Sequence, residues 1–266
     1  MENSDKESSI GKLLEDLKVL DSRYGITVEL DQISQRKSDK LGFARHVLYD
    51  TVPEANAALP VSRIREELAL YPPEYIHSLK LRRIILVRNL TESSFGGKIP
   101  EVGGIPIPKQ GLMYLDIGRD AIFMLELAQN LHHELSHFSD KEISGIRGRK
   151  KREEWVRLNP EGSKAYRVVE EYFSNRDLDV ERSEGFASLY GTFSLEEDRA
   201  EVAKLIMTMA PAPGYLRMLI QKDEVLASKV KTLLAGIREK SQRRVDEGYL
   251  EDLINKRVNE NYWDSR

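Results

Sequence analysis

The chain has 266 residues, of which 40% are hydrophobic and 32% charged, a composition typical of a globular protein with a substantial core. Its formal net charge of −3 gives no overall reason to expect nucleic-acid binding. It contains no cysteine, which excludes disulfides, a thiolate metal site and a cysteine nucleophile, so any metal must be held by His, Asp and Glu. No apolar run approaches the roughly 20 residues that a membrane-spanning helix needs.

Residues 1–9 are polar and predict a disordered or linker segment. They lack the apolar stretch at the centre of a signal peptide. This pattern fits a cytoplasmic protein or an exported one whose leader has been cut off, and it leaves the localisation open.

Residues 10–80 predict a mainly helical N-terminal region that packs on the domain that follows. Apolar residues recur at helical spacing from Ile10 to Leu20, and alternating residues over 26–30 predict a short strand. A second helix is expected over 54–71, because the Pro-Pro pair that follows cannot continue it.

Two strands are expected next, separated by a loop or a loose hairpin. The segment from Leu81 to Leu90 is rich in β-branched residues and predicts a central strand, whereas the glycines and prolines of 91–110 predict the loop. Residues 112–117 predict the second strand. It is a candidate edge strand that could pair with an extended peptide, although an ordinary sheet strand fits the pattern equally well.

Three of the five histidines lie in the segment Leu131–Phe138. His133 and His137 are four residues apart, so on an α-helix they share a face and their imidazoles can converge on one metal ion. Glu134 then projects beside them toward a bound water, which is the geometry behind the His-Glu-x-x-His pattern. His132 is five residues from His137 and points to a different side, so it is the poorer ligand.

The residues before this motif support a helix. Asp120 is a plausible N-cap. An unbroken apolar row with a spacing of four follows it, formed by Phe123, Leu127, Leu131 and Leu135. The helix is therefore expected to pack this row into a core while the two histidines face away from it.

The segment after the motif, residues 140–163, is charged and poorly periodic. It contains the basic run Arg147–Arg152, which can indicate nucleic-acid contact. Because no aromatic platform accompanies the run, we expect a solvated loop instead. Further along, residues 196–262 predict several helices with a break at Pro211–Gly214.

Two imidazoles leave a catalytic zinc ion one protein ligand short, and both remaining histidines lie upstream, so a downstream carboxylate is favoured. The stretch Gly185–Glu201 supplies several. Glu197 could instead form a capping box with Ser194 at the start of a helix. Glu197 and Glu201 nevertheless continue into an apolar helix face, where carboxylates are costly unless they are paired or bind metal.

At this point the pattern resembles a known family. The His133-Glu134-x-x-His137 motif, together with Tyr190, Glu197, Ala200 and Glu201, is similar to the gluzincin arrangement of the anthrax lethal factor catalytic domain and related bacterial zinc-binding metallopeptidases. In that group a tyrosine stands seven residues before the glutamate ligand, and an Ala-Glu pair follows the ligand. The resemblance covers roughly residues 81–210.

The resemblance implies zinc ligands at His133, His137 and Glu197, a general base at Glu134 and an oxyanion donor at Tyr190. Glu201 would match the acid that gluzincins place four residues after the ligand, where it steadies a ligand imidazole. The fold expected from it is α+β, with a zincin-like core over 81–210 that contains a mixed sheet and an active-site helix. A helical C-terminal lobe over 211–266 would follow.

The function expected on this basis is that of a zinc metallopeptidase, an endopeptidase with one zinc ion per chain, acting on a protein or peptide and not on nucleic acid. Three alternatives stay open. A catalytically silent zinc-binding interaction domain would need neither Glu134 nor Tyr190. A zinc hydrolase of a non-peptide substrate fits the same residues, and a nucleic-acid-binding protein would use Arg147–Arg152.

Overall fold

The computed structural model of the chain describes residues 2–31, 33–41, 46–94, 97–118, 124–140, 146–162, 166, 184–209, 213–242, 245 and 248–259. The chain divides into two compact units, Met1–Glu134 and Leu135–Arg266. This division falls inside helix α4 (Met124–Asp140), which runs through it without a break. None of the described helices is long and apolar enough to cross a membrane.

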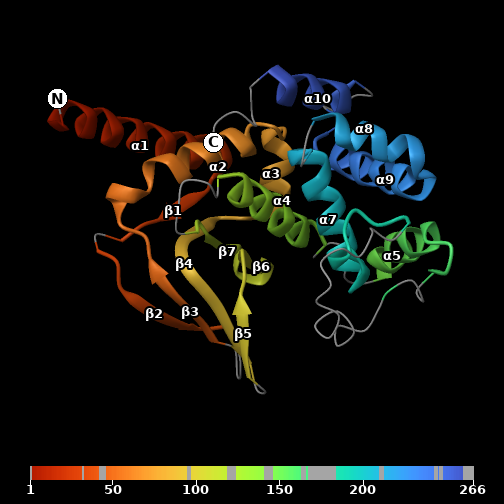
Figure 1. Cartoon of the computed structure of the whole chain (residues 1–266), viewed down its shortest axis with the longest axis horizontal. Coiled ribbons are helices and arrows are strands. Elements are labelled where there is room, and N and C mark those ends of the chain that lie inside the picture. Colours follow the sequence, from red (N-terminus) through yellow and green to blue (C-terminus); the bar gives the residue numbers. More distant parts are fainter. Residues whose placement is uncertain are drawn as a thin grey trace. The chain divides into compact units, whose positions relative to one another are not determined.

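Besides the first part of α4, the described helices of the first unit lie in its N-terminal part. They are α1 (Glu2–Tyr24), α2 (Ala58–Leu68) and α3 (Pro73–Leu79), with a short 3-10 turn η1 (Glu54–Asn56) before α2. α1 packs against α2 and α3 at one end of the sheet (Figure 1). α1 begins at Glu2, so residues 2–9 form its first turns and not a separate linker. The expected break at the Pro-Pro pair is present, but Pro73 also starts α3, because proline suits the first turn of a helix.

The sheet of the first unit is mixed. Its strands are β1 (Thr27–Glu29), β2 (Arg36–Lys40), β3 (His46–Thr51), β4 (Arg83–Ser94), β5 (Gly97–Glu101), β6 (Gly104–Ile107) and β7 (Leu112–Asp116). The main order is β2-β3-β4-β7-β6, and β1 and β5 also pair with β4 (Figure 1). β4 is parallel to β1 and β7 but antiparallel to β3 and β5. The expected α+β class, mixed sheet and central strand are therefore confirmed.

The edge of the sheet differs from the expectation. β7 lies between β4 and β6, so of the two interpretations of residues 112–117 the ordinary sheet strand is confirmed and the edge strand is not. β6 ends this side of the sheet among the described strands. The sequence predicted a loop in place of β6, because its glycine and proline residues usually indicate loops. The Asp116 amide donates to the Gly103 carbonyl at 2.9 Å. In an antiparallel pair, every second residue directs its main-chain N–H and C=O toward the partner strand, so the main-chain groups of Gly104 and Pro106 face away from β7. An edge strand tolerates Pro106 there because its missing N–H has no partner to lose.

One face of the sheet carries a hydrophobic core. Its buried members come from four neighbouring strands: Val47, Tyr49, Val87, Leu90, Ile105, Ile107, Leu112 and Tyr114. Tyr49 and Tyr114 also donate their hydroxyl groups to Asp39, at 2.8 and 2.6 Å. This shared acceptor ties β2, the outermost strand on the other side, to the core.

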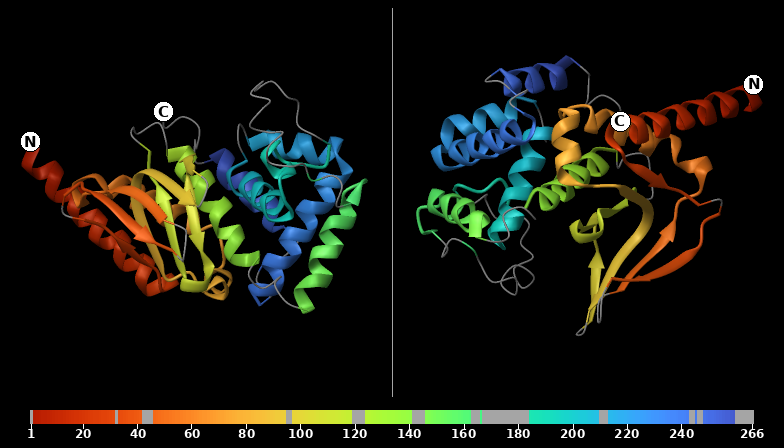
Figure 2. Two further views of the ribbon diagram at one scale, coloured as in Figure 1. Left: turned by 90° about the horizontal axis from the view of Figure 1, so that it is seen from below. Right: turned by 180° about the vertical axis from the view of Figure 1, so that it is seen from behind.

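The second unit is helical in its described part. It contains α5 (Ile146–Leu158), the 3-10 turn η6 (Tyr190–Thr192), α7 (Leu195–Thr208), α8 (Pro213–Lys222), α9 (Glu224–Lys240) and α10 (Tyr249–Asn259). α7 packs on η6, α5, α9 and α10, and α8 packs on α9 and α10, as two further views show (Figure 2). The expectation of a helix-rich C-terminal region is confirmed.

The basic run is part of a helix and not of a solvated loop. Residues 147–152 lie in α5, so the prediction of a loop is wrong. The sequence contained little sign of this helix because its apolar anchor is the single fully buried Trp155, while most of its other residues are charged. Arginine and lysine are nevertheless good helix formers, and the packing of Trp155 supplies the rest.

A buried polar network joins the helices of this unit. The Asp198 carboxylate accepts hydrogen bonds from Trp155 Nε1 at 2.8 Å, from the Tyr166 hydroxyl at 3.0 Å and from Lys229 Nζ at 2.7 Å. Lys229 Nζ also donates to the Gly185 carbonyl at 2.6 Å. Burial raises the pKa of Asp198 and lowers the pKa of Lys229, and the ion pair between them opposes both shifts. The network fixes α7 against α5 and α9.

Candidate metal centre

Helix α4 carries the His-Glu-x-x-His motif, as predicted. Its buried side follows the expected apolar row and includes Leu127, Ala128, Leu131, Leu135 and Phe138. The proposed N-cap Asp120 and the first member of the row, Phe123, lie outside the described residues. Within the described helix, His133 and His137 are partly buried one turn apart.

His132 is not available as a ligand because two buried side chains hold it. Its Nε2 lies 2.7 Å from Glu67 Oε2, and its Nδ1 lies 2.9 Å from the Tyr71 hydroxyl. Arg63 Nε in turn lies 3.1 Å from the other Glu67 oxygen. Since successive residues are about 100° apart around a helix, this clamp also fixes the rotation of α4 about its axis, and with it the direction of His133.

We expect His132→Ala to lower the free energy of unfolding by about 3 kcal/mol, because it leaves the buried Glu67 carboxylate without one of its partners. The matched control is His77→Ala, which removes an exposed histidine of α3 and should be neutral. Urea denaturation of the metal-free protein measures both. Equal stability of the two variants would contradict a structural role of the clamp.

The structure brings the three predicted ligands together. His133, His137 and Glu197 each offer one ligand atom, and these atoms lie within 4.8 Å of one another. His137 Nε2 and Glu197 Oε2 are 3.8 Å apart. Tetrahedral zinc with bonds near 2.1 Å places its ligand atoms roughly 3.4 Å apart, so a small closure suffices to bind an ion. Two imidazoles and one carboxylate are also a donor set of known catalytic zinc sites.

An ion pair ties the two helices that carry these ligands. Arg199 Nε of α7 lies 2.7 Å from Asp140 Oδ1 at the end of α4, and its guanidinium stacks over the Trp155 ring at 4.8 Å. Asp140 is one turn beyond His137, and Arg199 is two residues beyond Glu197. Burial raises the pKa of Asp140, while Arg199 beside it favours the ionised form. The pair therefore sets the distance between α4 and α7 next to the three predicted ligands.

Glu134 lies beside the edge strand of the sheet. It is only 6% exposed, and a Cβ atom at Gly104 would come within 2.5 Å of its Cγ. A Cβ atom at Gly103 would likewise come within 2.2 Å of the Asn130 side chain one turn earlier. The two glycines thus allow the start of β6 to pack directly on α4. The acid expected to act as the base is next to outward-facing main-chain groups of β6.

Glu201 and Tyr190 are not members of the three-residue group. Glu201 is buried, and its partners include the Ser188 hydroxyl and Lys204 Nζ, each at 2.6 Å. Tyr190 begins η6, which packs on α7, and its ring is 40% exposed and edge-on to Phe193 at 4.9 Å. Both residues therefore belong to the surroundings of the helix that carries Glu197.

Comparison of the chain with protein-family models, with curated proteins and with solved structures gave no match. The class of the protein therefore follows from its own residues and geometry. It is an α+β protein whose helices α4 and α7 carry a His-His-Glu group that could hold a metal ion.

Proposed function

We propose that the protein is a zinc-dependent metallopeptidase of the gluzincin type with a zincin-like core. The observation that carries the proposal is the convergence of His133, His137 and Glu197, with Glu134 adjacent to the first ligand in the same helix. A histidine pair on a single helix could arise by chance. A third ligand at the position expected from the gluzincin spacing makes chance much less plausible.

The residues of the chain divide the work of peptide hydrolysis between them. His133, His137 and Glu197 would hold the ion. A bound zinc ion supplies a Lewis acid that polarises a carbonyl group and lowers the pKa of water. Glu134 accepts the proton of the attacking water and delivers it to the leaving amine, the task of a general base that later acts as an acid.

The edge strand β6 offers a place for an extended peptide. The main-chain groups of Gly104 and the carbonyl of Pro106 face away from β7, and an added strand could hydrogen-bond to them. Since Gly104 packs against Glu134, a peptide paired with β6 would pass close to the proposed base. In this proposal β6, and not residues 112–117, is the strand that pairs with an extended substrate.

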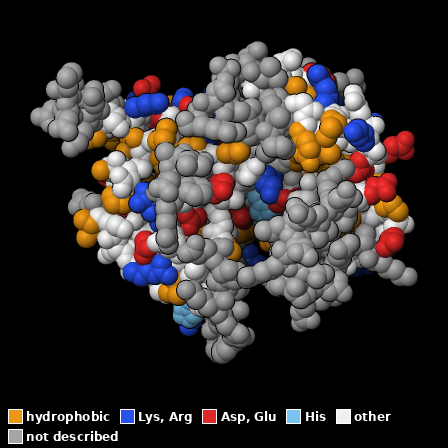
Figure 3. All heavy atoms as spheres, in the orientation of Figure 1, with side chains coloured by type: hydrophobic (Ala, Val, Ile, Leu, Met, Phe, Trp, Pro, Cys, Tyr) orange, Lys and Arg blue, Asp and Glu red, His pale blue; other side chains and the backbone are white. Residues whose placement is uncertain are grey.

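The charge distribution favours a peptide over a nucleic acid as partner. Three members of the basic run form ion pairs: Lys150 with Glu154, Lys151 with Glu239 and Arg152 with Glu196. Over the described part of the face in Figure 3, basic and acidic side chains are interspersed. A phosphate backbone requires a continuous basic surface, so this mixture supports the peptidase proposal.

Tyr190→Phe is expected to lower kcat roughly 10- to 1,000-fold with little change in KM or zinc content, because one oxyanion donor is lost in the transition state alone. Steady-state kinetics together with metal analysis measure this. Tyr215→Phe on α8 removes the same hydroxyl group elsewhere in the second unit and should leave kcat unchanged. A change confined to KM would instead make Tyr190 a substrate-binding residue.

The proposed function is tested by metal analysis combined with cleavage of a peptide library. The purified protein should retain about one zinc ion per chain after dialysis, as expected for three protein ligands. A chelator should abolish cleavage, and added zinc should restore it. A dialysed protein that retains no metal and cleaves no peptide would contradict the proposal.

A further inference from the structure

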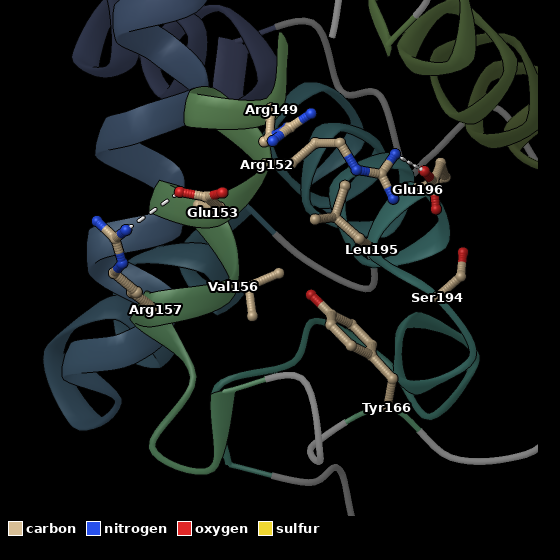
Figure 4. Close-up of a pocket in the computed structure, with 9 residues that line it drawn as sticks. All are labelled: Arg149, Arg152, Glu153, Val156, Arg157, Tyr166, Ser194, Leu195 and Glu196. Atoms are coloured by element: carbon tan, nitrogen blue, oxygen red, sulfur yellow. Dashed lines mark hydrogen bonds and ion pairs between the residues drawn. The ribbon is translucent and has the colours of Figure 1, made fainter. Parts of the chain in front are cut away.

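A pocket of 530 Å³ lies between α5 and the first turn of α7, within the second unit (Figure 4). Its lining residues are Arg149, Arg152, Glu153, Val156, Arg157, Tyr166, Ser194, Leu195 and Glu196. We call it the arginine pocket. Its volume falls in the range of about 300–1,000 Å³ that is usual for sites that bind small groups.

The helical register of α5 explains why arginines line this pocket. Arg149, Arg152, Glu153 and Val156 are spaced three, four and seven residues from the first, so they share one face of the helix. The basic run, which the sequence predicted to be a loop, thus forms part of an ordered helix surface. Trp155, fully buried on another side of α5, holds this face in place.

Three arginines and two glutamates line the pocket, so one positive charge has no acidic counterpart among its lining residues. Arg157 pairs with Glu153 at 3.3 Å, and Figure 4 shows Arg152 directed at Glu196, with which it forms an ion pair. Arg149 forms no ion pair with any residue that the structure describes. Its guanidinium is therefore free to bind an anion.

The walls of the pocket favour a carboxylate on an apolar stem. Val156 and the buried Leu195 contribute apolar surface. Tyr166 presents its ring, because its hydroxyl already donates to Asp198 and accepts from the Asn159 amide at 3.2 Å. Burial raises the pKa of Tyr166, so its phenol stays neutral. A single guanidinium can hold a carboxylate through two parallel hydrogen bonds, and the apolar walls suit the carbon stem that carries such a group.

The pocket adjoins the proposed metal centre along the chain. Glu196 lines the pocket and the next residue, Glu197, is the proposed third ligand, so one turn of α7 contributes to both. We propose that the arginine pocket is a recognition subsite that binds an acidic side chain of the peptide substrate. This inference rests on the proposed peptidase function and names its substrate class, an acidic peptide.

The test measures binding apart from cleavage. Full-length Glu134→Ala protein with zinc is titrated with fluorescein-labelled peptides of Ala, Ser and Gly that carry one Glu, Gln or Lys, moved along the peptide. Fluorescence anisotropy should show the Glu peptides binding roughly 5- to 10-fold tighter than the Gln peptides at one position, the effect of a partly solvated charge-assisted hydrogen bond. Free glutamate as competitor separates recognition of a peptide from capture of any carboxylate.

Charge reversal provides the sharpest variant. Arg149→Glu should reverse the preference from Glu to Lys at that position, whereas Arg149→Ala should abolish it. Lys150→Ala is the matched control, because it removes the same charge from the neighbouring residue, which is 82% exposed, pairs with Glu154 and does not line the pocket. Both positions are on the surface of α5, and circular dichroism checks that the three variants are folded.

Failure of this inference differs from failure of the proposed function. Equal binding of Glu, Gln and Lys peptides would overturn the subsite, as would equal effects of Arg149→Ala and Lys150→Ala or displacement of the peptides by free glutamate at equal affinity. Wild-type protein could still cleave peptides in any of these cases. A clear Glu preference in a protein that retains no metal after dialysis and cleaves nothing in the peptide library would instead overturn the peptidase and retain the acidic-peptide pocket.

Discussion

Glu134→Gln should retain zinc and lose at least about 100-fold in kcat, because the amide cannot accept the proton of the attacking water. Glutamine has nearly the same shape as glutamate, so it keeps the close contact with Gly104 of β6. Glu134→Ala should show the same loss but would also open space at this contact. Metal analysis and peptide cleavage, measured on the same preparations, separate coordination from proton transfer.

The control for this experiment is Glu126→Gln. Glu126 is an exposed residue in the first turn of the same helix, so its replacement changes the charge of α4 equally. Its turnover should match that of the wild type. Unchanged turnover of Glu134→Gln would refute the proposed mechanism, whereas loss of zinc from that variant would move Glu134 from proton transfer to metal binding.

Periodic features of the chain were visible in the sequence. The four-spaced apolar row correctly predicted helix α4 and the side on which it is buried, and β-branched residues correctly predicted the central strand β4. These signals are local, because burial on one face repeats with the period of the element itself. The rejection of His132 as a ligand also followed from helical geometry, and its contacts with Glu67 and Tyr71 agree with that.

Features that depend on distant partners were not visible. Glu67 and His132 are 65 residues apart, Asp140 and Arg199 are 59 apart, and Asp198 and Lys229 are 31 apart. A polar pair of this kind has no periodicity, so each residue alone resembles an ordinary surface charge. Such buried pairs are nevertheless what holds α4 and α7 in place around the candidate site.

The edge strand and the basic helix were missed for a different reason. Local composition contradicted the structure in both: glycine and proline in β6, and a run of charges in α5. In each element tertiary contacts decide the outcome, through the pairing of β6 with β7 and the burial of Trp155. Both elements line the surfaces for which we propose function, where local rules are most often broken.

Glu197→Ala should empty the metal site on dialysis, because two imidazoles alone bind zinc too weakly. The helix should survive the change. Ser194 caps α7 through the backbone N–H of Glu197, at 3.2 Å, and alanine keeps that donor. Loss of metal with an unchanged circular dichroism spectrum would therefore assign the effect to the carboxylate and not to the helix start.

Substitution of the neighbouring acidic residues tests whether Glu197, and not another acid of α7, is the third ligand. Glu196→Ala is the matched control: it breaks an ion pair with Arg152 on the surface, which contributes little to stability, and it should keep zinc. Glu201→Ala should weaken zinc binding roughly 10- to 100-fold and leave the ion bound at saturation, as expected for a residue that steadies a ligand.

Asp198 requires a conservative substitution. Alanine would leave the buried Lys229 without its ion-pair partner and destabilise the second unit. Asp198→Asn keeps an oxygen that can accept a hydrogen bond from Lys229, so the folded fraction of this variant should bind zinc as the wild type does. Zinc lost from Glu196→Ala or from folded Asp198→Asn, but kept by Glu197→Ala, would place the third ligand at another residue of the same turn. The two histidines of α4 would remain the first two ligands, since their spacing does not depend on α7.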